Sequence, residues 1–251
     1  MDESGSQIGL SRRSFLGKGL AVSGVAIVGG VAAACSDSKS SSAGSSSTTV
    51  TTTPVNSPDD AVNRLLAGNK RFVGGHLDHP RRDDKQRAEQ AEGQTPFAVI
   101  LGCADSRVPP EIIFDEGLGD LFSVRVAGNT SPADVVLGSI EYGAAVLNCK
   151  LIVVLGHGEC GAVKAAIDQV TKSKSVPGHI GGFVDPIVPA VKAVQTTPAD
   201  QLLDAAIKEN VRRTVSQLQS SQPVLAPLVQ SGQLKVVGAE YELHSGQVEL
   251  V

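Results

Sequence analysis

Short, continuously apolar runs alternate with longer stretches of helical periodicity over most of the chain beyond residue 96. Such apolar runs are typical of strands that are buried on both faces of a sheet. Three runs are expected to be strands: 97–102, 121–126 and 151–156. The periodic stretches predict helices over 132–147, 162–170 and 199–220. Strands separated by helices predict an α/β fold with a mainly parallel central sheet flanked by helices.

The two ends of this sheet region carry further elements. Ser57 can cap a helix and Pro58 suits its first turn, so a helix is expected over 57–72, with Ser131 and Pro132 opening the 132–147 helix in the same way. A second, very polar helix over 82–92 would complete an N-terminal helical arm. Glycine and proline in the 171–186 stretch predict a loop. At the C-terminus, two segments should pair as a hairpin: 234–243 and 246–251.

The beginning of the chain differs in kind from the rest. Over residues 1–35, SRRSFLG is followed by a weakly apolar stretch and then VAAAC, which is the order of an export signal. SRRSFLG resembles a twin-arginine motif and VAAAC a lipobox whose Cys35 would be lipidated; cleavage without lipidation and a single-pass anchor are the alternatives. Residues 36–56 are almost all Ser and Thr and are expected to be a disordered linker. We therefore expect a cell-envelope protein, a membrane-anchored lipoprotein in preference to a secreted or periplasmic one, with its catalytic domain at 57–251.

Composition and cysteine count narrow the classes of function. The 251 residues carry a net charge of -4, aromatic residues make up 3%, and tryptophan is absent. A basic surface and stacking platforms for bases are both lacking, so no nucleic-acid partner is expected. Beyond Cys35 the cysteines are Cys103, Cys149 and Cys160, an odd number that does not suit a complete set of disulfides. Cys149, at the start of an apolar strand, is expected to be a small core residue.

Two short motifs at strand ends carry the candidate chemistry. CADSRVPP begins at Cys103, and GHGECG contains His157 and Cys160; Cys103 and His157 each follow directly on an apolar run. Thiolate and imidazole are ligands that zinc prefers, and the glycines around His157 let the chain turn so that His157 and Cys160 reach one ion. The carboxyl ends of parallel strands meet at one edge of a sheet, where ligands bind. The sequence therefore predicts a zinc site with three protein ligands and a fourth position for water.

Asp105 and Arg107 distinguish two kinds of zinc site. Asp105 lies two residues beyond a ligand, so it could close a structural site as the fourth ligand. Alternatively, Arg107 binds the carboxylate through two parallel hydrogen bonds and keeps it ionised and off the metal, where it can accept a hydrogen bond from zinc-bound water. The residue types alone leave both arrangements open.

The stretches CADSRVPP and EYGAAVLNCKLIVVLGHGECG resemble the two signatures of the β-class carbonic anhydrases, and the similarity extends over essentially all of residues 57–251. The resemblance implies that the three ligands hold one zinc ion per subunit and that the carboxylate–guanidinium pair is the catalytic dyad. It implies reversible hydration of CO2 to bicarbonate and a proton by zinc-bound hydroxide. Two other functions stay open: a CS2 or COS hydrolase with the same zinc and dyad, and a non-catalytic, zinc-stabilised envelope protein.

The resemblance also implies a substrate pocket and a partner. Gln94 matches a glutamine that helps to bind bicarbonate, Phe122 and Tyr142 match an apolar wall, and Gly161 would offer a backbone N–H near the substrate. Ile100 stands where the regulated branch of the family has tryptophan, so the open, water-bound form is expected. Because this family pairs its subunits, we expect a homodimer or a higher homo-oligomer.

Three further positions bear on packing and on the surroundings of the predicted site. Gly143 stands where the family usually has alanine, which is expected to be a packing detail. His244 stands where a threonine is frequent, far along the chain from the ligands. Arg125 is ambiguous between a structural ion pair and an edge of the pocket.

Overall fold

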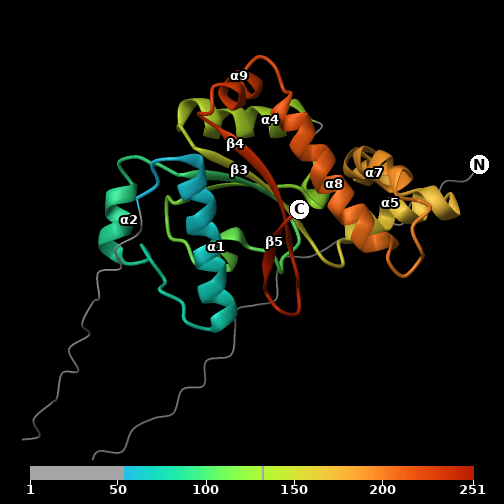
Figure 1. Cartoon of the computed structure of the whole chain (residues 1–251), viewed down its shortest axis with the longest axis horizontal. Coiled ribbons are helices and arrows are strands. Elements are labelled where there is room, and N and C mark those ends of the chain that lie inside the picture. The colour runs from blue at the N-terminus through green and yellow to red at the C-terminus, as the bar shows by residue number, and fades with distance from the viewer. Residues whose placement is uncertain (1–53, 132) are drawn as a thin grey trace, which may run out of the picture. The chain divides into compact units, whose positions relative to one another are not determined.

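The computed structural model describes residues 54–131 and 133–251, so the expected export signal, with Cys35, and nearly all of the expected linker lie outside the described residues. The described part contains a five-stranded sheet in the order β2-β1-β3-β4-β5 (Figure 1). The strands are β1 (Ala98–Gly102), β2 (Leu121–Arg125), β3 (Leu151–His157), β4 (Lys235–Tyr241) and β5 (Val248–Leu250). The first four pair in parallel, and β5 returns antiparallel to β4. The predicted α/β fold, its first three strands and its terminal hairpin are confirmed.

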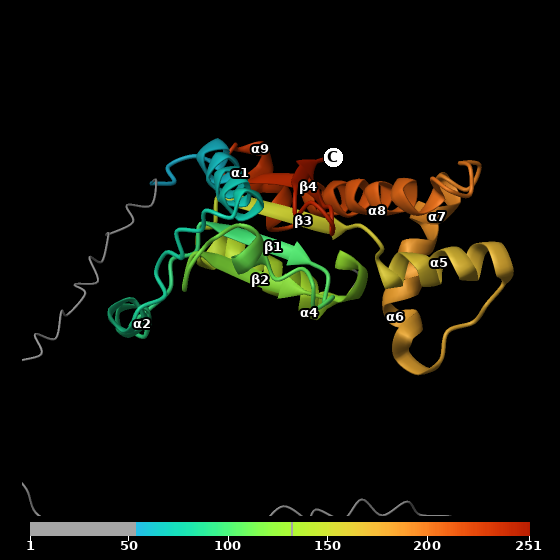
Figure 2. The same ribbon diagram turned by 90° about the horizontal axis from the view of Figure 1, so that it is seen from below.

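Helices lie on both faces of this sheet, as Figure 2 shows. The longer helices are α1 (Pro58–Gly74), α2 (Asp84–Gln90), α4 (Asp134–Glu141), α5 (Gly161–Lys172) and α8 (Leu202–Gln219). The short ones are α3 (Pro110–Ile113), α6 (Gly181–Val184), α7 (Val188–Ala193) and α9 (Leu225–Gln230). Single turns of other helix types are η1 (Ala127–Asn129), η2 (Tyr142–Val146), η3 (Gly178–Ile180) and η4 (Asp185–Ile187). Among the helices of the described residues, none combines the length and apolar character that a membrane span requires.

Two hydrophobic cores lie on the two faces of the sheet. Alternate residues of β1 point into different cores: Ala98 and Ile100 into one, Val99 and Leu101 into the other. The first core also contains buried residues of α1, α5 and α7, and the second contains buried residues of α4 and α9, while α8 contributes to both. Burial on both faces explains why these strands are apolar without alternation.

Cys149 belongs to the second of these cores. It is 3% exposed, and its thiol donates a hydrogen bond to Pro96 O at 3.3 Å. Burial raises the pKa of Cys149 to about 12, so the thiol stays protonated and unreactive. The prediction that Cys149 is a small core residue is confirmed.

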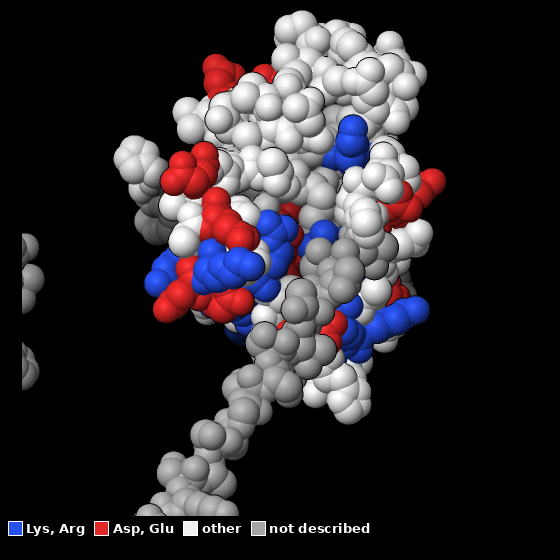
Figure 3. All heavy atoms as spheres, turned by 90° about the vertical axis from the view of Figure 1, so that its left-hand side faces the viewer, with Lys and Arg blue, Asp and Glu red and all other residues white. Residues whose placement is uncertain are grey.

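The N-terminal arm is held by local caps and by buried ion pairs. Ser57 accepts a hydrogen bond from the N–H of Asp60, whose carboxylate in turn accepts from the N–H of Ser57, a complete capping box. Further along α1, Arg64 donates to both carboxylate oxygens of Glu116, which is 1% exposed. The expected polar helix is present as α2, shorter than predicted and with no buried residue. Figure 3 shows basic and acidic side chains interspersed on the face that carries α2.

Two sequence-based expectations for the helices were wrong. Ser131 does not cap the 132–147 helix: α4 begins at Asp134 behind the backbone of Ala133, which makes no side-chain cap, and Pro132 lies outside the described residues. The C-terminal part of that helix is the wider π-helical turn η2. The second error is the 171–186 loop, which contains η3, α6 and part of η4, because buried residues such as Val184 pack it onto the core.

The close approach of η2 to the sheet accounts for Gly143. A Cβ on Gly143 would lie 2.5 Å from Cγ2 of Val99 and 3.2 Å from Cδ1 of Phe122. Since a side-chain atom cannot fit at that distance, Gly143 lets the turn pack against β1 and β2. The expectation that this position is a packing detail agrees with these contacts.

The register of the central strands positions the candidate ligands. Gly102, the last residue of β1, pairs with Leu155 of β3, so both strands end at the same edge of the sheet. Cys103 follows β1 directly, as predicted. His157 is the last residue of β3 rather than the residue after it, because it still pairs with Tyr241 of β4.

Candidate metal centre

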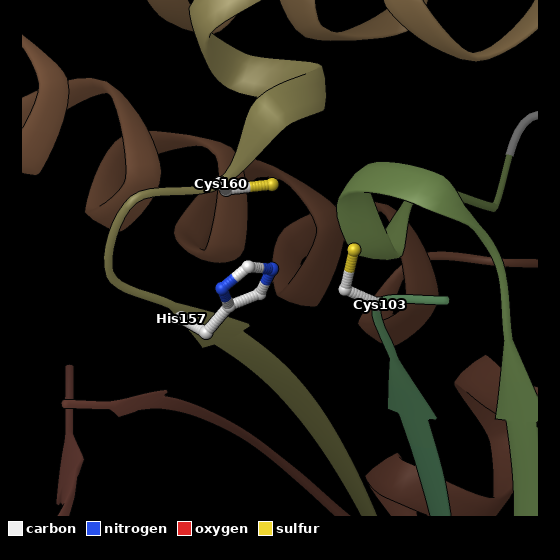
Figure 4. A group of neighbouring side chains, drawn as sticks. All are labelled: Cys103, His157 and Cys160. Atoms are coloured by element: carbon white, nitrogen blue, oxygen red, sulfur yellow. The ribbon is translucent and has the colours of Figure 1, made fainter. Parts of the chain in front are cut away.

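Three side chains that can bind metal converge at the carboxyl edge of the sheet (Figure 4). Cys103 comes from the end of β1, His157 from the end of β3, and Cys160 from the N-cap position of α5. All three are buried, and their ligand atoms lie within 4.8 Å of one another. The structure thus brings together the three predicted ligands from two strands and one helix.

The imidazole of His157 is prepared for a ligand. Its Nδ1 lies 2.8 Å from the carbonyl oxygen of Gly158, so Nδ1 carries the hydrogen and Nε2 keeps a free lone pair. Nε2 is buried and has no hydrogen-bond partner among the described residues. A buried polar atom without a partner costs free energy, and a metal ion at Nε2 would remove that cost. The residues therefore fit a metal with a preference for sulfur and nitrogen ligands.

The two sulfur atoms influence each other's ionisation. The pKa of Cys103 falls to about 4, first because the Cys160 thiol donates a hydrogen bond to its thiolate. The same hydrogen bond, together with burial, raises the pKa of Cys160. Burial opposes the charged form of His157, but Cys103, the carbonyl oxygen of Gly158 and the charge of Asp105 together outweigh it and raise the pKa of His157. A thiolate in a buried site is a strong attraction for a cation.

A backbone amide that the sequence did not indicate supports Cys103. The N–H of Gly128 donates to Sγ of Cys103 at 3.3 Å, and the side-chain amide of Asn210 donates to the carbonyl oxygen of Gly128 at 2.9 Å. Gly128 has a φ of 76°, and a Cβ there would lie 2.5 Å from Cδ1 of Ile187. Glycine is therefore required by both the backbone conformation and the close approach. In the sequence, this interaction is indicated only by a glycine shortly after β2, and a glycine at such a position is too common to predict it.

Asp105 and Arg107 form a pair beside the three ligands. Nε of Arg107 donates to Oδ1 of Asp105 at 2.9 Å and Nη2 to Oδ2 at 2.7 Å, while the backbone N–H of Arg107 adds a third bond at 2.9 Å. Oδ2 lies 4.0 Å from Nε2 of His157. The hydrogen bonds from Arg107 hold the pKa of Asp105 well below its usual range. The carboxylate is thus ionised, oriented and adjacent to the ligand atoms.

Arg125 holds the loop that carries this pair. Its Nε donates to the carbonyl oxygen of Cys103 at 3.0 Å and its Nη2 to that of Asp105 at 2.5 Å. The sequence predicted either an ion pair or a position at the edge of the pocket for Arg125. Instead, Arg125 stabilises the backbone of CADSR by hydrogen bonds from the neighbouring strand.

The predicted pocket residues divide into two groups. Gly161 begins α5 next to Cys160 and is exposed. Gln94, in contrast, lies before β1, and Cys103 lies directly after it. The five residues of β1, at about 3.3 Å each, alone place Gln94 and Cys103 roughly 16 Å apart. Phe122 pairs with Val99 near the start of β1, and its ring lies 6.0 Å from that of Tyr142. Within one chain, the structure therefore does not bring Gln94, Phe122 and Tyr142 to the metal centre.

The fold and the centre together define a class of protein: an α/β protein with a buried Cys2His cluster that could hold a metal ion and a carboxylate–guanidinium pair beside it. Comparisons with known proteins agree. A family model described as carbonic anhydrase matches residues 98–248. Carbonic anhydrase 2 of Mycobacterium tuberculosis is 42% identical over 197 residues, which cover 78% of this chain and 94% of that protein. A carbonic anhydrase of Mycolicibacterium smegmatis is 40% identical, with 78% of this chain and 95% of that protein covered.

Solved structures give the same result. The β-carbonic anhydrase of Coccomyxa, in complex with acetazolamide, superimposes with a TM-score of 0.61 at 28% identity, covering 79% of this chain and 87% of that one. The β-carbonic anhydrase CcaA superimposes with a TM-score of 0.60 at 26% identity, covering 76% and 94%. The chain belongs to the carbonic anhydrase family, in its β class. The predicted enzyme class and reaction, hydration of CO2 to bicarbonate, are confirmed.

Proposed function

We propose that Cys103, His157 and Cys160 hold a zinc ion and that CO2 is hydrated beside it, with Asp105 and Arg107 as the catalytic dyad. The observation that carries this proposal is a carboxylate that lies close to a three-ligand cluster but has both its oxygens held by Arg107. Both oxygens of Asp105 accept hydrogen bonds from Arg107. A closed structural site would instead use such a carboxylate as its fourth ligand.

Zinc suits the donor set. Two sulfurs and one imidazole nitrogen favour zinc over the hard cations that prefer oxygen. Three protein ligands are the number found in catalytic zinc sites, which keep one position for water or substrate. When bound, zinc would act as a Lewis acid that makes water nucleophilic near neutral pH.

Asp105 acts on the hydrogen of the attacking water. As an ionised carboxylate it can only accept hydrogen bonds, and Arg107 keeps it ionised. By accepting the hydrogen of the water, Asp105 directs the oxygen lone pair toward the carbon of CO2. Arg107 fixes both carboxylate oxygens, so the position of Asp105 does not depend on the metal.

The pocket roles of Gln94, Phe122 and Tyr142 require a second copy of the chain. These residues lie toward the amino ends of the strands, so they reach a metal centre only if that centre belongs to a neighbouring subunit. The exposed position of Tyr142, at 46%, leaves it available for such a contact. We therefore place substrate between two chains of a homodimer, or of a higher oligomer that contains this dimer.

The proposed location is the cell envelope. The twin-arginine-like SRRSFLG and the lipobox-like VAAAC support export followed by lipidation of Cys35, with the Ser/Thr-rich stretch as a tether. Replacing Arg12 and Arg13 with Lys is expected to leave the protein and its activity in the cytosolic fraction. Cys35→Ser is expected to move it from the membrane fraction to the soluble fraction, whereas an unchanged distribution of both variants would contradict this route.

The function is tested by stopped-flow CO2 hydration on the purified, zinc-loaded full chain, with Asp105→Ala beside it. The proposal predicts hydration that Asp105→Ala reduces by roughly 10² or more. Consumption of CS2 and COS is measured on the same samples. Turnover of these sulfur compounds without CO2 hydration would identify a CS2 or COS hydrolase, and zinc binding without any turnover would identify a non-catalytic zinc protein.

A further inference from the structure

We propose that His244 transfers protons between the catalytic site and the solvent, and that Glu242 holds its imidazole for this purpose. The inference rests on the proposed function, because each CO2 hydrated to bicarbonate releases one proton that has to leave a buried site. Histidine is the side chain whose charge ordinarily changes between pH 5 and 8, so it suits proton transfer near neutrality.

The turn that carries His244 lies beside the metal centre although it is distant in sequence. β3 and β4 are neighbours in the sheet (Figure 1), and His157 is opposite Tyr241 in their register. The N–H of Gly158 donates to the carbonyl oxygen of Tyr241 at 3.0 Å. The segment after Gly158 and the turn after Tyr241 therefore leave the sheet side by side, at the edge where the ligands are.

Glu242 fixes which nitrogen of His244 is available. Its Oε1 lies 2.9 Å from Nδ1 of His244 and accepts the backbone N–H of the same residue at 2.9 Å. Hydrogen bonds from the backbone of His244 and Ser245 lower the pKa of Glu242 to about 2, so the carboxylate stays charged. A charged carboxylate can only accept, so Nδ1 carries the hydrogen in the neutral ring and Nε2 has a free lone pair. The side chain of His244 is 90% exposed, so Nε2 is open to solvent.

The transfer is a balanced exchange of one proton. A proton that leaves the site through water binds Nε2 and converts the neutral imidazole into imidazolium. A buffer base then takes the proton from the ring and restores the neutral form. His244 lies in the turn that directly follows β4, and β4 pairs with β3, the strand that ends at His157. The other described histidines are placed elsewhere: His76 and His79 follow α1, and His179 lies in η3, beyond the far end of α5.

The test compares His244→Gln with the zinc-loaded wild-type full chain by ¹⁸O exchange in weakly buffered solution. The method separates the interconversion of CO2 and bicarbonate, which needs no proton from outside, from the release of labelled water, which does. In His244→Gln the release of labelled water is predicted to fall about tenfold, less than the roughly 10²–10⁴ of a directly placed acid or base. Interconversion should stay within about twofold, and added imidazole buffer should restore the release. The matched control His179→Gln should change neither rate.

Equal release of labelled water in wild type and His244→Gln would overturn the proposal, and so would a parallel fall of both rates, which indicates damage to the site. A wild type without CO2–bicarbonate exchange would overturn the proposed function and this inference with it. A second measurement is independent of activity and metal: ¹H–¹⁵N NMR of the imidazole nitrogens. It should show the neutral His244 ring with its hydrogen on Nδ1, and a hydrogen on Nε2 would contradict the geometry.

Discussion

The pairing of Asp105 with Arg107 leads to the sharpest mutational prediction. Asp105→Asn removes the charge of the carboxylate but keeps its size, and Arg107→Ala removes the two side-chain hydrogen bonds that hold it, at 2.9 and 2.7 Å. If the two residues act as a unit, either change alone abolishes the function of the other. The double variant should then be no worse than the poorer single variant.

The geometry of the pair sets the expected losses of kcat/KM, and its exposure sets the expected effect on stability. Each single change is predicted to lower kcat/KM about 100-fold, equivalent to about 2.7 kcal/mol of transition-state stabilisation. Independent residues would give about 10⁴-fold in the double variant, whereas a unit gives about 100-fold, a coupling of about 2.7 kcal/mol. The side chain of Arg107 is 53% exposed, so its loss should leave the free energy of unfolding almost unchanged.

The assay is stopped-flow CO2 hydration at a fixed alkaline pH, with urea unfolding on the same samples. Arg87→Ala is the matched control, because Arg87 forms an exposed ion pair with Asp84 at 2.9 Å in α2, and it should leave kcat/KM within about twofold. Additive losses in the double variant, or losses that follow the stability of each variant, would refute the reasoning.

Three other predictions concern the metal, acid stability and the assembly. Removing the metal with a chelator should abolish hydration and lower the melting temperature measured by calorimetry, and added Zn²⁺ should restore both. An ion at about a thousand times its Kd stabilises the folded protein by about 4 kcal/mol. An unchanged melting temperature would contradict a metal site. Burial opposes ionisation of Asp115, but the hydrogen bonds from Arg71 and from the backbone N–H groups of Asp78 and His79 together outweigh it and lower the pKa of Asp115. Its stabilisation is therefore present above the unfolded pKa of about 4 and is lost as the pH falls through the lower folded pKa. Asp115→Asn should thus lower the free energy of unfolding by about 2–3 kcal/mol at pH 7 and by much less near pH 3, as urea unfolding would measure, and an equal loss at both pH values would be inconsistent with this linkage. Unfolding and refolding equal amounts of a Cys160→Ser chain and a Gln94→Ala chain together should recover about one quarter of wild-type hydration, because half of the dimers are mixed and one of their two sites is intact; activity no higher than that of the separate variants would argue against a shared site.

How far the sequence predicts the fold depends on whether the determining interactions are local. The runs that became β1 and β3 are buried on both faces, so their composition alone identifies them. The cap at Ser57 depends on residues within one turn of helix and was equally readable. The short helices α7 and α9 were missed because their helical state depends on tertiary packing: α7 is anchored by Val191 and α9 by Leu225, both fully buried.

The residues of the candidate site likewise differ in how far the sequence predicts them. Cys103, His157 and Cys160 could be brought together from the sequence because parallel strands end at one edge. The amide of Gly128, by contrast, meets Cys103 across 25 positions of sequence and involves only backbone atoms, which leave no residue-type signal. His244 was judged remote by its position in the chain, whereas the pairing of β3 with β4 brings its turn to the metal edge.

The central claim is a metal ion with three protein ligands and a fourth position that Asp105 leaves open. The most direct measurement is a crystal structure of the zinc-loaded full chain grown at alkaline pH, with anomalous diffraction at the zinc edge. The account predicts one zinc per chain on Cys103, His157 and Cys160, a non-protein fourth ligand, and Asp105 still bound to Arg107. A carboxylate oxygen of Asp105 on the zinc, or no metal at these three residues, would contradict it.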